Sequence, residues 1–437
     1  MAKSKKPQAP VLLGEVDLPE GVLLILDPGL ARFWRHDAEP ASPRKKDPAE
    51  FDLRLTGPDA VAAGSAYDRE FDARFLFDRR DPREAVDHFA RFAQEQGFDA
   101  RAEVLPSRIP HTERARLALE HGGGLGVVKY NGLWAVAVGA LPRGKGLRVV
   151  GTPMPSGEFE GRWESIELVV DDAEEPVGTE SVDGVMVEHG QLLFAGLGPL
   201  GHFRMWEPLD GLADYVFSGA DAPALAKAEG ASDLGDGLFG WRDLPMAQVG
   251  EKATPLQERI ERESLSVGVD YRPHCNLERL NARLRVSEED TASLVLDGAR
   301  VVGCGNRWGD GVFTVSRDVD AQGRTLRVRV ELGTEQRQRM MRRLRLLQQK
   351  AIVSRTILDD GEPIRFAERM APSRPEDSGW AFSSGVEDAA YMDEPSNFAV
   401  VSLRDLVARF KALEPILEAP EGALYRLEGT RFVPDSQ

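Results

Sequence analysis

The sequence contains only two cysteines, Cys275 and Cys304, among 437 residues. Two cysteines cannot form a disulfide scaffold, and so few are typical of proteins from a reducing cytosol. Long apolar runs are also missing, because VLLGEVDLPEGVLLIL near the N-terminus is interrupted by acids and by Pro19. A signal peptide or a membrane span of about 18 apolar residues is therefore not expected. These absences predict a soluble cytoplasmic protein.

Positive charge is in deficit as well. The chain has 55 Lys and Arg against 72 Asp and Glu, a net charge of −17. Nucleic-acid binding needs a basic face that attracts phosphates, so this balance disfavours a general nucleic-acid binder. It permits a basic protein partner. The length suggests two to four domains, at about 100–200 residues per domain.

Local patterns predict a mixed α+β organisation. The apolar run GVLLILDPG near the N-terminus, closed by Pro-Gly, indicates a buried strand, and the alternating FDARFLF at 71–77 indicates a half-buried one. Asp81 and Pro82 are typical of a helix start, and Gly97 of its end. Apolar residues recur at helical spacing between them, namely Val86, Phe89, Phe92 and Ala93.

Further signals place other elements. A helix is expected from Thr112 to His121, and Asn131-Gly132 between two apolar runs predicts a β-hairpin. A helix is expected over residues 254–264, and residues 320–323 are interpreted as a four-residue hairpin loop. The acidic stretch 171–181 contains Pro and Gly, which favours a domain boundary.

These patterns predict an α+β fold built from several small domains with antiparallel or mixed sheets. The expected parts are a tail, strand and linker over residues 1–59, a ferredoxin-like α+β domain over 60–170, a second α+β domain over 182–333, a connecting helix over 334–350, and a final α+β domain over 351–437.

Residues 196–201 read GLGPLG and match the GxGxxG pattern of dinucleotide-binding folds, with Asp221 about twenty residues beyond. In that fold a long helix must follow and present its N-terminus to phosphate. The next residues, HFRMWEPLDG, contain Pro208 and no such helix pattern. The motif is therefore interpreted as a glycine-rich loop.

His274, Cys275 and Cys304 raise the alternatives of a zinc site or a catalytic thiol. Neither cysteine has a second ligand at the C-x₂₋₄-C spacing of a zinc site. A catalytic thiol needs a positioned base, and the adjacent His274 and Cys275 would point to opposite faces of a strand. Buried core cysteines are the preferred interpretation. The sequence also lacks the GxSxG and HExxH motifs, so we expect neither catalytic residues nor a metal or cofactor site.

Two further patterns have plain structural interpretations. Residues 318–323 begin like a calcium loop, but Arg329 stands where the bidentate glutamate is required. The arginine-rich stretch 334–350 suits a solvated helix face better than a nucleic-acid site in an acidic chain.

The C-terminal segment carries a recognisable signature. It comprises Ser378-Gly379-Trp380, an SGxED motif at Ser384–Asp388, Tyr391 and the stretch Asp393–Asn397. The segment from Ala351 onward resembles the immunity-protein thirty-three-like family of bacterial toxin-immunity loci. More weakly, residues 308–312 and the early GVLLILDPG run resemble an uncharacterised bacterial domain that often has the same neighbouring genes as that family.

The resemblance implies a non-enzymatic protein that binds and neutralises a toxin. Residues 351–437 hold 9 Lys and Arg against 16 Asp and Glu, a net of −7, which would complement a basic toxin. The expected partner-binding residues combine acids with aromatic anchors, and the bland alternative is that the acids solvate a loop and the aromatics lie in the core. They are Trp380, Glu387, Asp388, Tyr391, Asp393 and Glu394.

Two other functions stay open from the sequence. The first is an enzyme or small-ligand-binding protein, with residues 196–221 or the region of His274 and Cys304 lining its site between α+β domains. The second is a regulatory adaptor without a toxin partner. A cleft with convergent polar groups would favour the former, whereas an acidic face with central aromatics would favour immunity. Neither a nucleic acid nor a membrane is expected as a partner.

Overall fold

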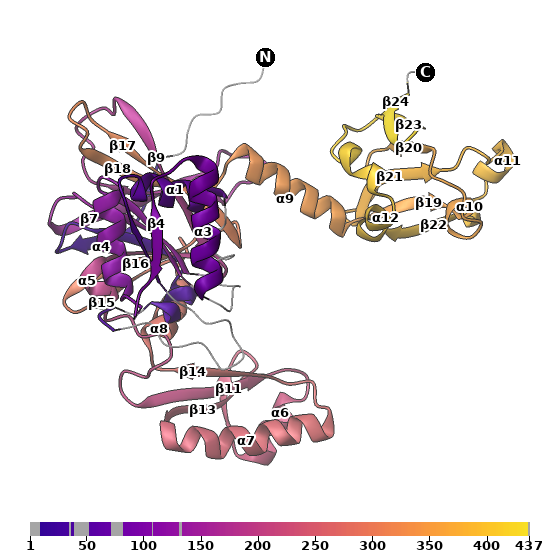
Figure 1. The fold of residues 1–437 in the computed structure, drawn as a ribbon. Helices are drawn as coiled ribbons and strands as arrows, with labels where there is room; N and C mark the ends of the chain where they lie inside the picture. The colour runs from indigo at the N-terminus through magenta and orange to yellow at the C-terminus, as the bar shows by residue number, and fades with distance from the viewer. Residues whose placement is uncertain are drawn as a thin grey trace. The chain divides into compact units, whose positions relative to one another are not determined.

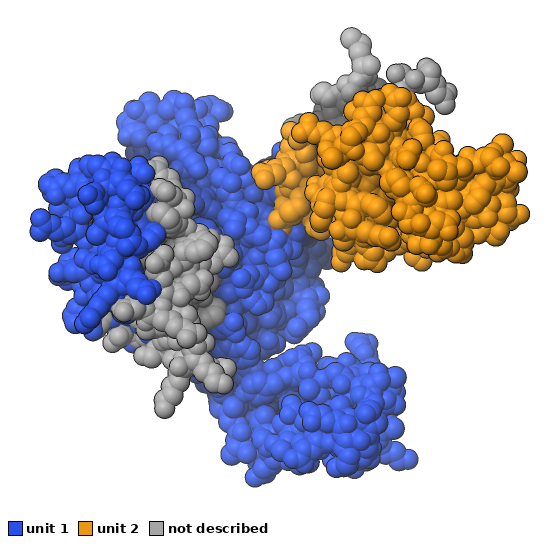
Figure 2. Space-filling view, turned by 45° about the vertical axis from the view of Figure 1, so that its right-hand side comes forward, with its two compact units in different colours: residues 1–333 blue, residues 334–437 orange. Residues whose placement is uncertain are grey.

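The computed structural model describes residues 9–34, 36–38, 52–70, 82–106, 108–130 and 133–435. The chain forms two compact units, residues 1–333 and residues 334–437, which Figure 2 colours separately. Both units combine helices with sheets, which confirms the predicted α+β class (Figure 1). Within the described ranges, no helix is both long and apolar enough to cross a membrane.

Two six-stranded antiparallel sheets form the centre of the N-terminal unit. In spatial order, the first sheet contains β1 (Val11–Leu18), β7 (Gly144–Pro153), β8 (Trp163–Val169), β18 (Thr325–Glu331), β17 (Gly311–Val319) and β9 (Gly178–Val187). The second contains β15 (Thr291–Leu296), β16 (Ala299–Gly305), β10 (Gln191–Gly196), β2 (Leu23–Leu26), β6 (Leu133–Val138) and β5 (Leu125–Tyr130).

The central strands of the second sheet are continuous apolar runs in the sequence because they are buried. All four residues of β2 are fully buried, because β10 and β6 flank the strand and both of its faces are covered. This confirms the buried strand predicted from GVLLILDPG. The predicted hairpin is confirmed too, since Tyr130 of β5 pairs with Leu133 of β6; the Asn131-Gly132 turn lies outside the described residues.

An ion pair joins the two sheets. Asp17 of β1, in the first sheet, is almost fully buried and faces Arg300 of β16, in the second sheet, with Nη2 to Oδ1 at 2.8 Å. The same carboxylate accepts hydrogen bonds from the backbone N–H groups of Arg300 and Gly146. Burial raises the pKa of Asp17, but these hydrogen bonds outweigh that effect and hold the pKa below its usual value.

A small helical layer has its own core. It comprises the two-stranded sheet β3 (Leu53–Thr56) and β4 (Arg101–Val104) with α1 (Ala60–Glu70) and α3 (Pro82–Gln96). Tyr67, Phe89 and Phe92 pack edge to face in that core. The helix predicted from Pro82 is confirmed, and Gly97 ends it with a φ of 75°. The strand predicted at 71–77, like Asp81, lies outside the described residues.

The sheets do not follow the domains predicted over 60–170 and 182–333. Strands β7 and β8 precede the expected boundary at 171–181, yet they share one sheet with β9, β17 and β18. The ferredoxin-like assignment differs from the structure for the same reason, because β5 to β8 belong to the two large sheets. A polar turn with Pro and Gly connects strands within a unit as readily as it connects domains.

Residues 212–273, here called the inserted subdomain, form a third sheet. In spatial order it contains β12 (Ser232–Gly235), β13 (Leu238–Pro245), β11 (Leu212–Ser218) and β14 (Gly268–Pro273), with α6 (Ala222–Glu229) and α7 (Met246–Glu263). Helix α7 begins eight residues before the predicted start, because Val249, Leu256 and Ile260 continue one apolar face past Pro255. The unit also contains η1 (Pro28–Phe33), α4 (His111–His121), α5 (Leu197–Leu200) and α8 (Asn276–Leu284).

The C-terminal unit is one mixed six-stranded sheet with helices. In spatial order the strands are β22 (Phe398–Ser402), β19 (Lys350–Ser354), β21 (Asp377–Ser383), β20 (Phe366–Arg369), β23 (Leu424–Glu428) and β24 (Arg431–Pro434). Only β19 and β21 pair in parallel. The helices are α9 (Glu335–Gln348), α10 (Arg355–Leu358), α11 (Ala389–Met392), η2 (Pro395–Asn397), α12 (Leu403–Arg409) and η3 (Lys411–Ile416).

Helix α9 is part of this unit rather than a bare connector. Leu346 and Leu347 in its last turn pack against the core of residues 351–417, and Arg343 lies 3.3 Å from Glu414 of η3. Its first turns are more exposed, including Met340 and Leu344. Residues 334–350 hold six Lys and Arg and one Glu, so the helix is strongly basic.

We predict that a fragment of residues 334–437 folds on its own and is more stable than a fragment of residues 351–437. The reason is the apolar contact of Leu346 and Leu347, which is worth about 1–3 kcal/mol at partial burial. Urea denaturation of both fragments, followed by circular dichroism, measures the difference. Equal stabilities would show that α9 contributes nothing to the unit.

Candidate functional site

The residues predicted to bind a partner cluster around one segment of the C-terminal unit, residues 384–397 between β21 and β22, here called the acidic loop. It contains α11 and η2. The structure brings Glu387, Asp388, Tyr391, Asp393 and Glu394 together on this segment, but it gives them different surroundings. Some of these side chains hold the loop in shape, and others face solvent.

Glu387 is the anchor of the acidic loop. Its Oε1 accepts hydrogen bonds from the backbone N–H and the hydroxyl of Ser384, at 3.0 and 2.9 Å, and from the hydroxyl of Thr356 at 2.7 Å. Its Oε2 accepts one from the N–H of Gly385 at 2.6 Å. Burial raises the pKa of this carboxyl, but the hydrogen bonds from Ser354, Ser384 and Thr356 outweigh it and hold the pKa far below its usual range.

Asp388 and Glu394 cap short helices. The carboxylate of Asp388 accepts a hydrogen bond from the N–H of Tyr391 at 2.8 Å, which caps α11. Glu394 caps η2 through the N–H of Ser396. Both side chains remain exposed, so each has a structural role and is also available to a partner.

Tyr391 is fixed from both ends. Its hydroxyl donates to the carbonyl of Asn397 at 3.1 Å, and the amide of Asn397 donates back to the carbonyl of Tyr391 at 2.9 Å. Its ring meets Phe398 edge to face, at 6.1 Å between centroids. The side chain is therefore half-buried and pinned, so only part of it faces a partner.

Trp380 does not fit the predicted role of direct partner contact, because it is completely buried. It stacks on Phe382, and its indole N–H donates to the carbonyl of Leu417 at 3.2 Å. The preceding Gly379 has a φ of 73°, and a Cβ there would lie 2.2 Å from the carbonyl oxygen of Met370. The SGW signature thus shapes the core and one tight backbone approach, as the bland interpretation of the aromatics expected.

The acidic loop exposes two apolar residues that sequence reasoning missed. Val386 is 57% exposed and Met392 is 49% exposed, and both lie among Asp388, Asp393 and Glu394. Exposed apolar side chains ringed by charge are a feature of binding surfaces. In the sequence, Val386 and Met392 could have been found as isolated large aliphatic residues in a loop that is mostly polar.

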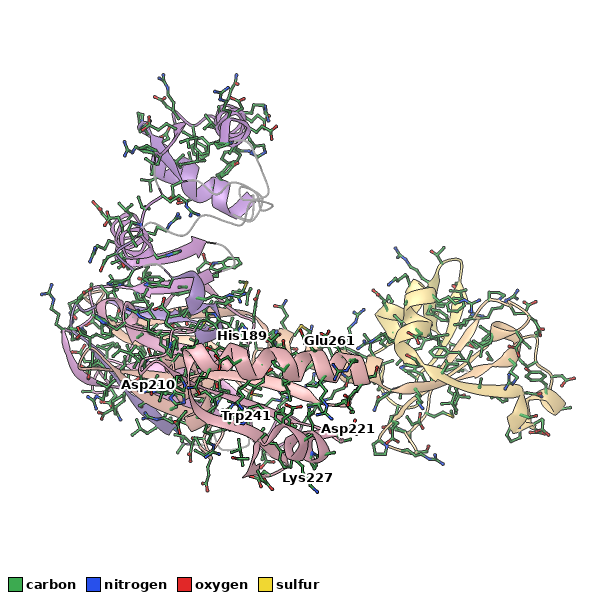
Figure 3. The ribbon with its side chains drawn as sticks, turned by 90° about the horizontal axis from the view of Figure 1, so that it is seen from below. His189, Asp210, Asp221, Lys227, Trp241 and Glu261 are labelled. Carbon is green, nitrogen blue, oxygen red and sulfur yellow. The ribbon has the colours of Figure 1, made fainter. Side chains whose placement is uncertain are left out.

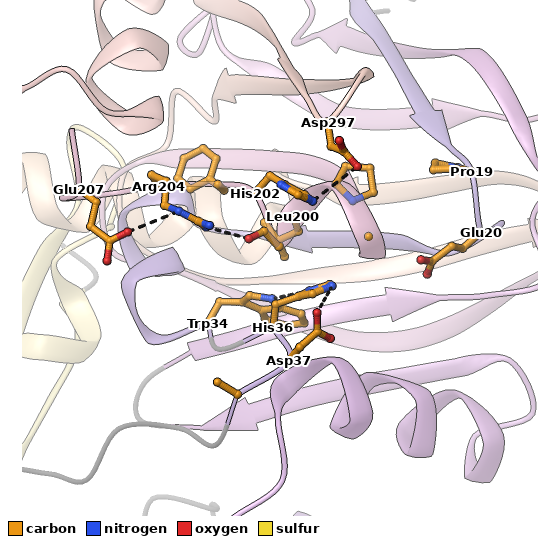
Figure 4. Close-up of a pocket in the computed structure, with 15 residues that line it drawn as sticks. Pro19, Glu20, Trp34, His36, Asp37, Leu200, His202, Arg204, Glu207 and Asp297 are labelled. Carbon is orange, nitrogen blue, oxygen red and sulfur yellow. Dashed lines mark hydrogen bonds and ion pairs between the residues drawn. The ribbon is translucent and has the colours of Figure 1, made fainter. Parts of the chain in front are cut away.

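The N-terminal unit contains a pocket of about 840 Å³, which Figure 4 shows. Residues 198–204 line one part of it, and Trp34 and His36 line another. His36 Nδ1 lies 2.9 Å from the Thr112 hydroxyl. Burial lowers the pKa of His36 below the usual value of a histidine.

The pocket explains the GxGxxG match. A Cβ on Gly201 would lie 2.5 Å from the His36 ring, and one on Gly198 would lie 2.8 Å from Oε1 of Glu20. The helix after Gly196 has only four residues and is thus too short for a dinucleotide site. The glycines permit close packing of side chains around the pocket.

The other sequence motifs have structural roles. Both cysteines are free and buried, which confirms the core interpretation, and burial raises the pKa of each thiol. The apparent calcium loop is a hairpin, since β17 and β18 pair on either side of it, and the carboxylate of Asp318 forms an ion pair with Arg329 at 2.8 Å. Val319 pairs with Thr325, so the hairpin loop has one residue more than predicted.

Comparison with known families identifies the C-terminal unit. Residues 351–433 match the family model of the Immunity protein Imm33 domain. This match confirms the resemblance noted from the SGW and SGxED residues, and it associates residues 351–433 with a toxin-immunity role. It does not extend to residues 1–333. None of the curated proteins and none of the solved structures matches the chain.

We predict that Glu387→Gln destabilises the C-terminal unit by about 1–3 kcal/mol at pH 7, because several hydrogen bonds lose their charged acceptor. The folded-state pKa of Glu387 lies below its unfolded value. Its contribution is therefore complete above pH 4.5 and is lost as the pH falls below that value, so the variant should lose less stability between pH 5 and 3 than the wild type.

Pulsed hydrogen exchange along a urea gradient, read on peptides from residues 377–402, measures this stability in the full chain. Glu376→Gln, at an exposed glutamate just before β21, is the matched control. If both variants behave like the wild type, Glu387 does not anchor the acidic loop.

Proposed function

We propose that the C-terminal unit is an immunity module that binds a protein toxin through the exposed side of the acidic loop and blocks its action without catalysis. The match of residues 351–433 to the Immunity protein Imm33 domain is the observation that carries this proposal. We place the protein in the cytosol, where buried free thiols such as Cys275 and Cys304 remain reduced.

The acidic loop supports binding because it is organised in advance. Glu387, the caps at Asp388 and Glu394, and the Tyr391–Asn397 pair fix its backbone, so little conformational entropy is lost on association. Val386 and Met392 supply exposed apolar surface on this loop. The surrounding carboxylates favour a toxin with a basic face, since complementary charge speeds encounter.

The individual side chains have separate roles in this proposal. Met392 and Val386 are the anchors that become desolvated, and Asp393 is a rim charge that steers association. Glu387 holds the loop and makes no contact. A charge reversal at Glu387 would consequently act through loop structure, whereas one at Asp393 would act through the field felt by the partner.

We expect Met392→Ala to raise the dissociation rate about 5- to 30-fold, which corresponds to the loss of 1–2 kcal/mol at an interface anchor. Asp393→Lys should lower the association rate and weaken its dependence on salt. The measurement is surface kinetics of the full chain at two ionic strengths, on a toxin candidate sought among the proteins encoded beside this gene.

Met370→Ala provides the matched control, because Met370 is 38% exposed in the same unit but follows β20, outside the acidic loop. Growth protection in cells that produce the toxin candidate gives the second readout. If toxin is bound with full affinity by both the Met392 and the Asp393 variants, the acidic loop is not the contact surface. If the full chain binds no toxin candidate and gives no protection, the immunity role itself is wrong.

The pocket of the N-terminal unit favours a second candidate function, binding of a small cationic molecule. Carboxylates of Glu20, Asp37 and Asp297 line it beside two imidazoles, and its guanidinium, from Arg204, is occupied by Glu207 at 3.4 Å. A pocket of this volume suits a small ligand. Small diamines should raise the melting temperature of the full chain, and less so with Glu20→Gln; equal or absent shifts would remove this candidate.

A further inference from the structure

One histidine and three aspartates gather at one end of the inserted subdomain, on two of its strands and just beyond its two ends. Asp214 lies on β11, Asp243 on β13, and His274 directly after β14; Asp210 precedes β11. Figure 3 labels Asp210, near the start of α7 and at the opposite end of the subdomain from Asp221 and Glu261. The backbone agrees with this placement, because the N–H of Met246 donates to the carbonyl of Gly211.

A β-bulge brings the two strand carboxylates together. Ala213 pairs with Leu244 and Tyr215 pairs with Trp241, so two residues of β13 stand opposite Asp214 alone. This extra residue turns the Asp243 side chain toward Asp214. One ligand-type atom each from Asp214, Asp243 and His274 then lie within 4.8 Å of one another.

The distances suit a tetrahedral ion. Two ligands that are each 2.0–2.1 Å from a tetrahedral zinc lie about 3.3 Å apart. His274 Nε2 lies 3.2 Å from Oδ1 of Asp214 and 3.8 Å from Oδ1 of Asp243. All three ligand atoms lie within 4.8 Å of one another, at side chains that reach solvent and can therefore close around an ion.

The far side of the imidazole is arranged as metal-binding histidines usually are. His274 Nδ1 lies 2.9 Å from Oδ2 of Asp210. A carboxylate that accepts the Nδ1 proton leaves the Nε2 lone pair facing the ion and raises its basicity. Asp210 in this arrangement is a positioning residue and not a ligand.

We infer that Asp214, Asp243 and Nε2 of His274 bind a divalent transition-metal ion of the zinc class, with Asp210 orienting the imidazole. Three protein ligands leave a fourth position for water or for a donor atom of a partner. The nitrogen ligand favours zinc over calcium and magnesium, which prefer all-oxygen sites. This site is independent of the proposed immunity function.

The sequence predicts no metal site, because ligands at short spacing are missing around Cys275 and Cys304. The three ligands are about 30 residues apart along the chain, and only the sheet register and its bulge bring them together. The neighbouring Cys275 is buried and donates to the carbonyl of Met205 at 2.9 Å. The thiol therefore faces the core and not the proposed ion.

The test is calorimetric titration of the metal-stripped full chain with ZnCl₂ against a competing chelator, in parallel with MgCl₂ and CaCl₂. We expect one zinc per chain, no comparable response to magnesium or calcium, and at least a tenfold loss of zinc affinity in His274→Gln and in Asp214→Asn. Asp210→Asn should lose 10- to 100-fold, as expected of a group that orients a ligand.

His189→Gln is the matched control, because His189 also faces an aspartate, Asp27, at 3.3 Å but belongs to no such ligand group. It should bind zinc like the wild type. Circular dichroism and the melting temperature show whether each variant is folded. The visible spectrum after cobalt substitution, with its tetrahedral bands lost in His274→Gln, gives a readout that a structural role alone would not change.

Two outcomes would overturn the inference. Absence of zinc binding to the folded wild type at micromolar zinc would leave His274 as a structural ion-pair partner of its aspartates. Equal zinc binding by the wild type and the folded His274→Gln variant would mean adventitious binding elsewhere on the chain.

Discussion

The ion pair between the buried Asp17 and the part-exposed Arg300 is the interaction on which the N-terminal unit depends. It joins the first strand of one large sheet to the second sheet across almost 300 residues of sequence, and it satisfies a carboxylate that would otherwise be very unfavourable to bury. Each sheet also mixes strands from early and late parts of residues 1–333. No early segment of the chain can therefore complete either sheet alone. Strands that precede the inserted subdomain and strands that follow it belong to the same two sheets, so the subdomain must fold between strands of one core.

The C-terminal unit separates side chains that hold its shape from side chains that face solvent. The signature residues around Ser378–Trp380 and Glu387 have structural roles. The indole of Trp380 is buried, Gly379 has a positive φ, and the carboxylate of Glu387 accepts hydrogen bonds within the loop. Val386, Met392 and Asp393 face solvent without such roles. Substitutions at these exposed positions should therefore disturb the fold less than substitutions at the signature residues.

Local signals in the sequence predicted local structure well. The helix from Pro82, the hairpin that joins Tyr130 to Leu133, and the buried strand at Leu23–Leu26 all follow from capping, turn chemistry and apolar pattern. Sheet partners did not follow, because pairing of β8 with β18 depends on contacts that no local window contains. The same limit applies to the site: composition found the acids near Tyr391, but it could not distinguish the anchoring Glu387 from the free surface at Met392.

Charge in the C-terminal unit is segregated along the chain. The basic α9 packs by its last turn on a body, residues 351–437, that carries a net −7, and apart from contacts such as Arg343 with Glu414 its positive charge lies on a separate element from that negative charge. Such an arrangement is an electric dipole. In the field of an approaching charged molecule it experiences a torque before any contact forms. The geometry of the first encounter would then be selected at a distance, by a helix that need not touch the partner at all.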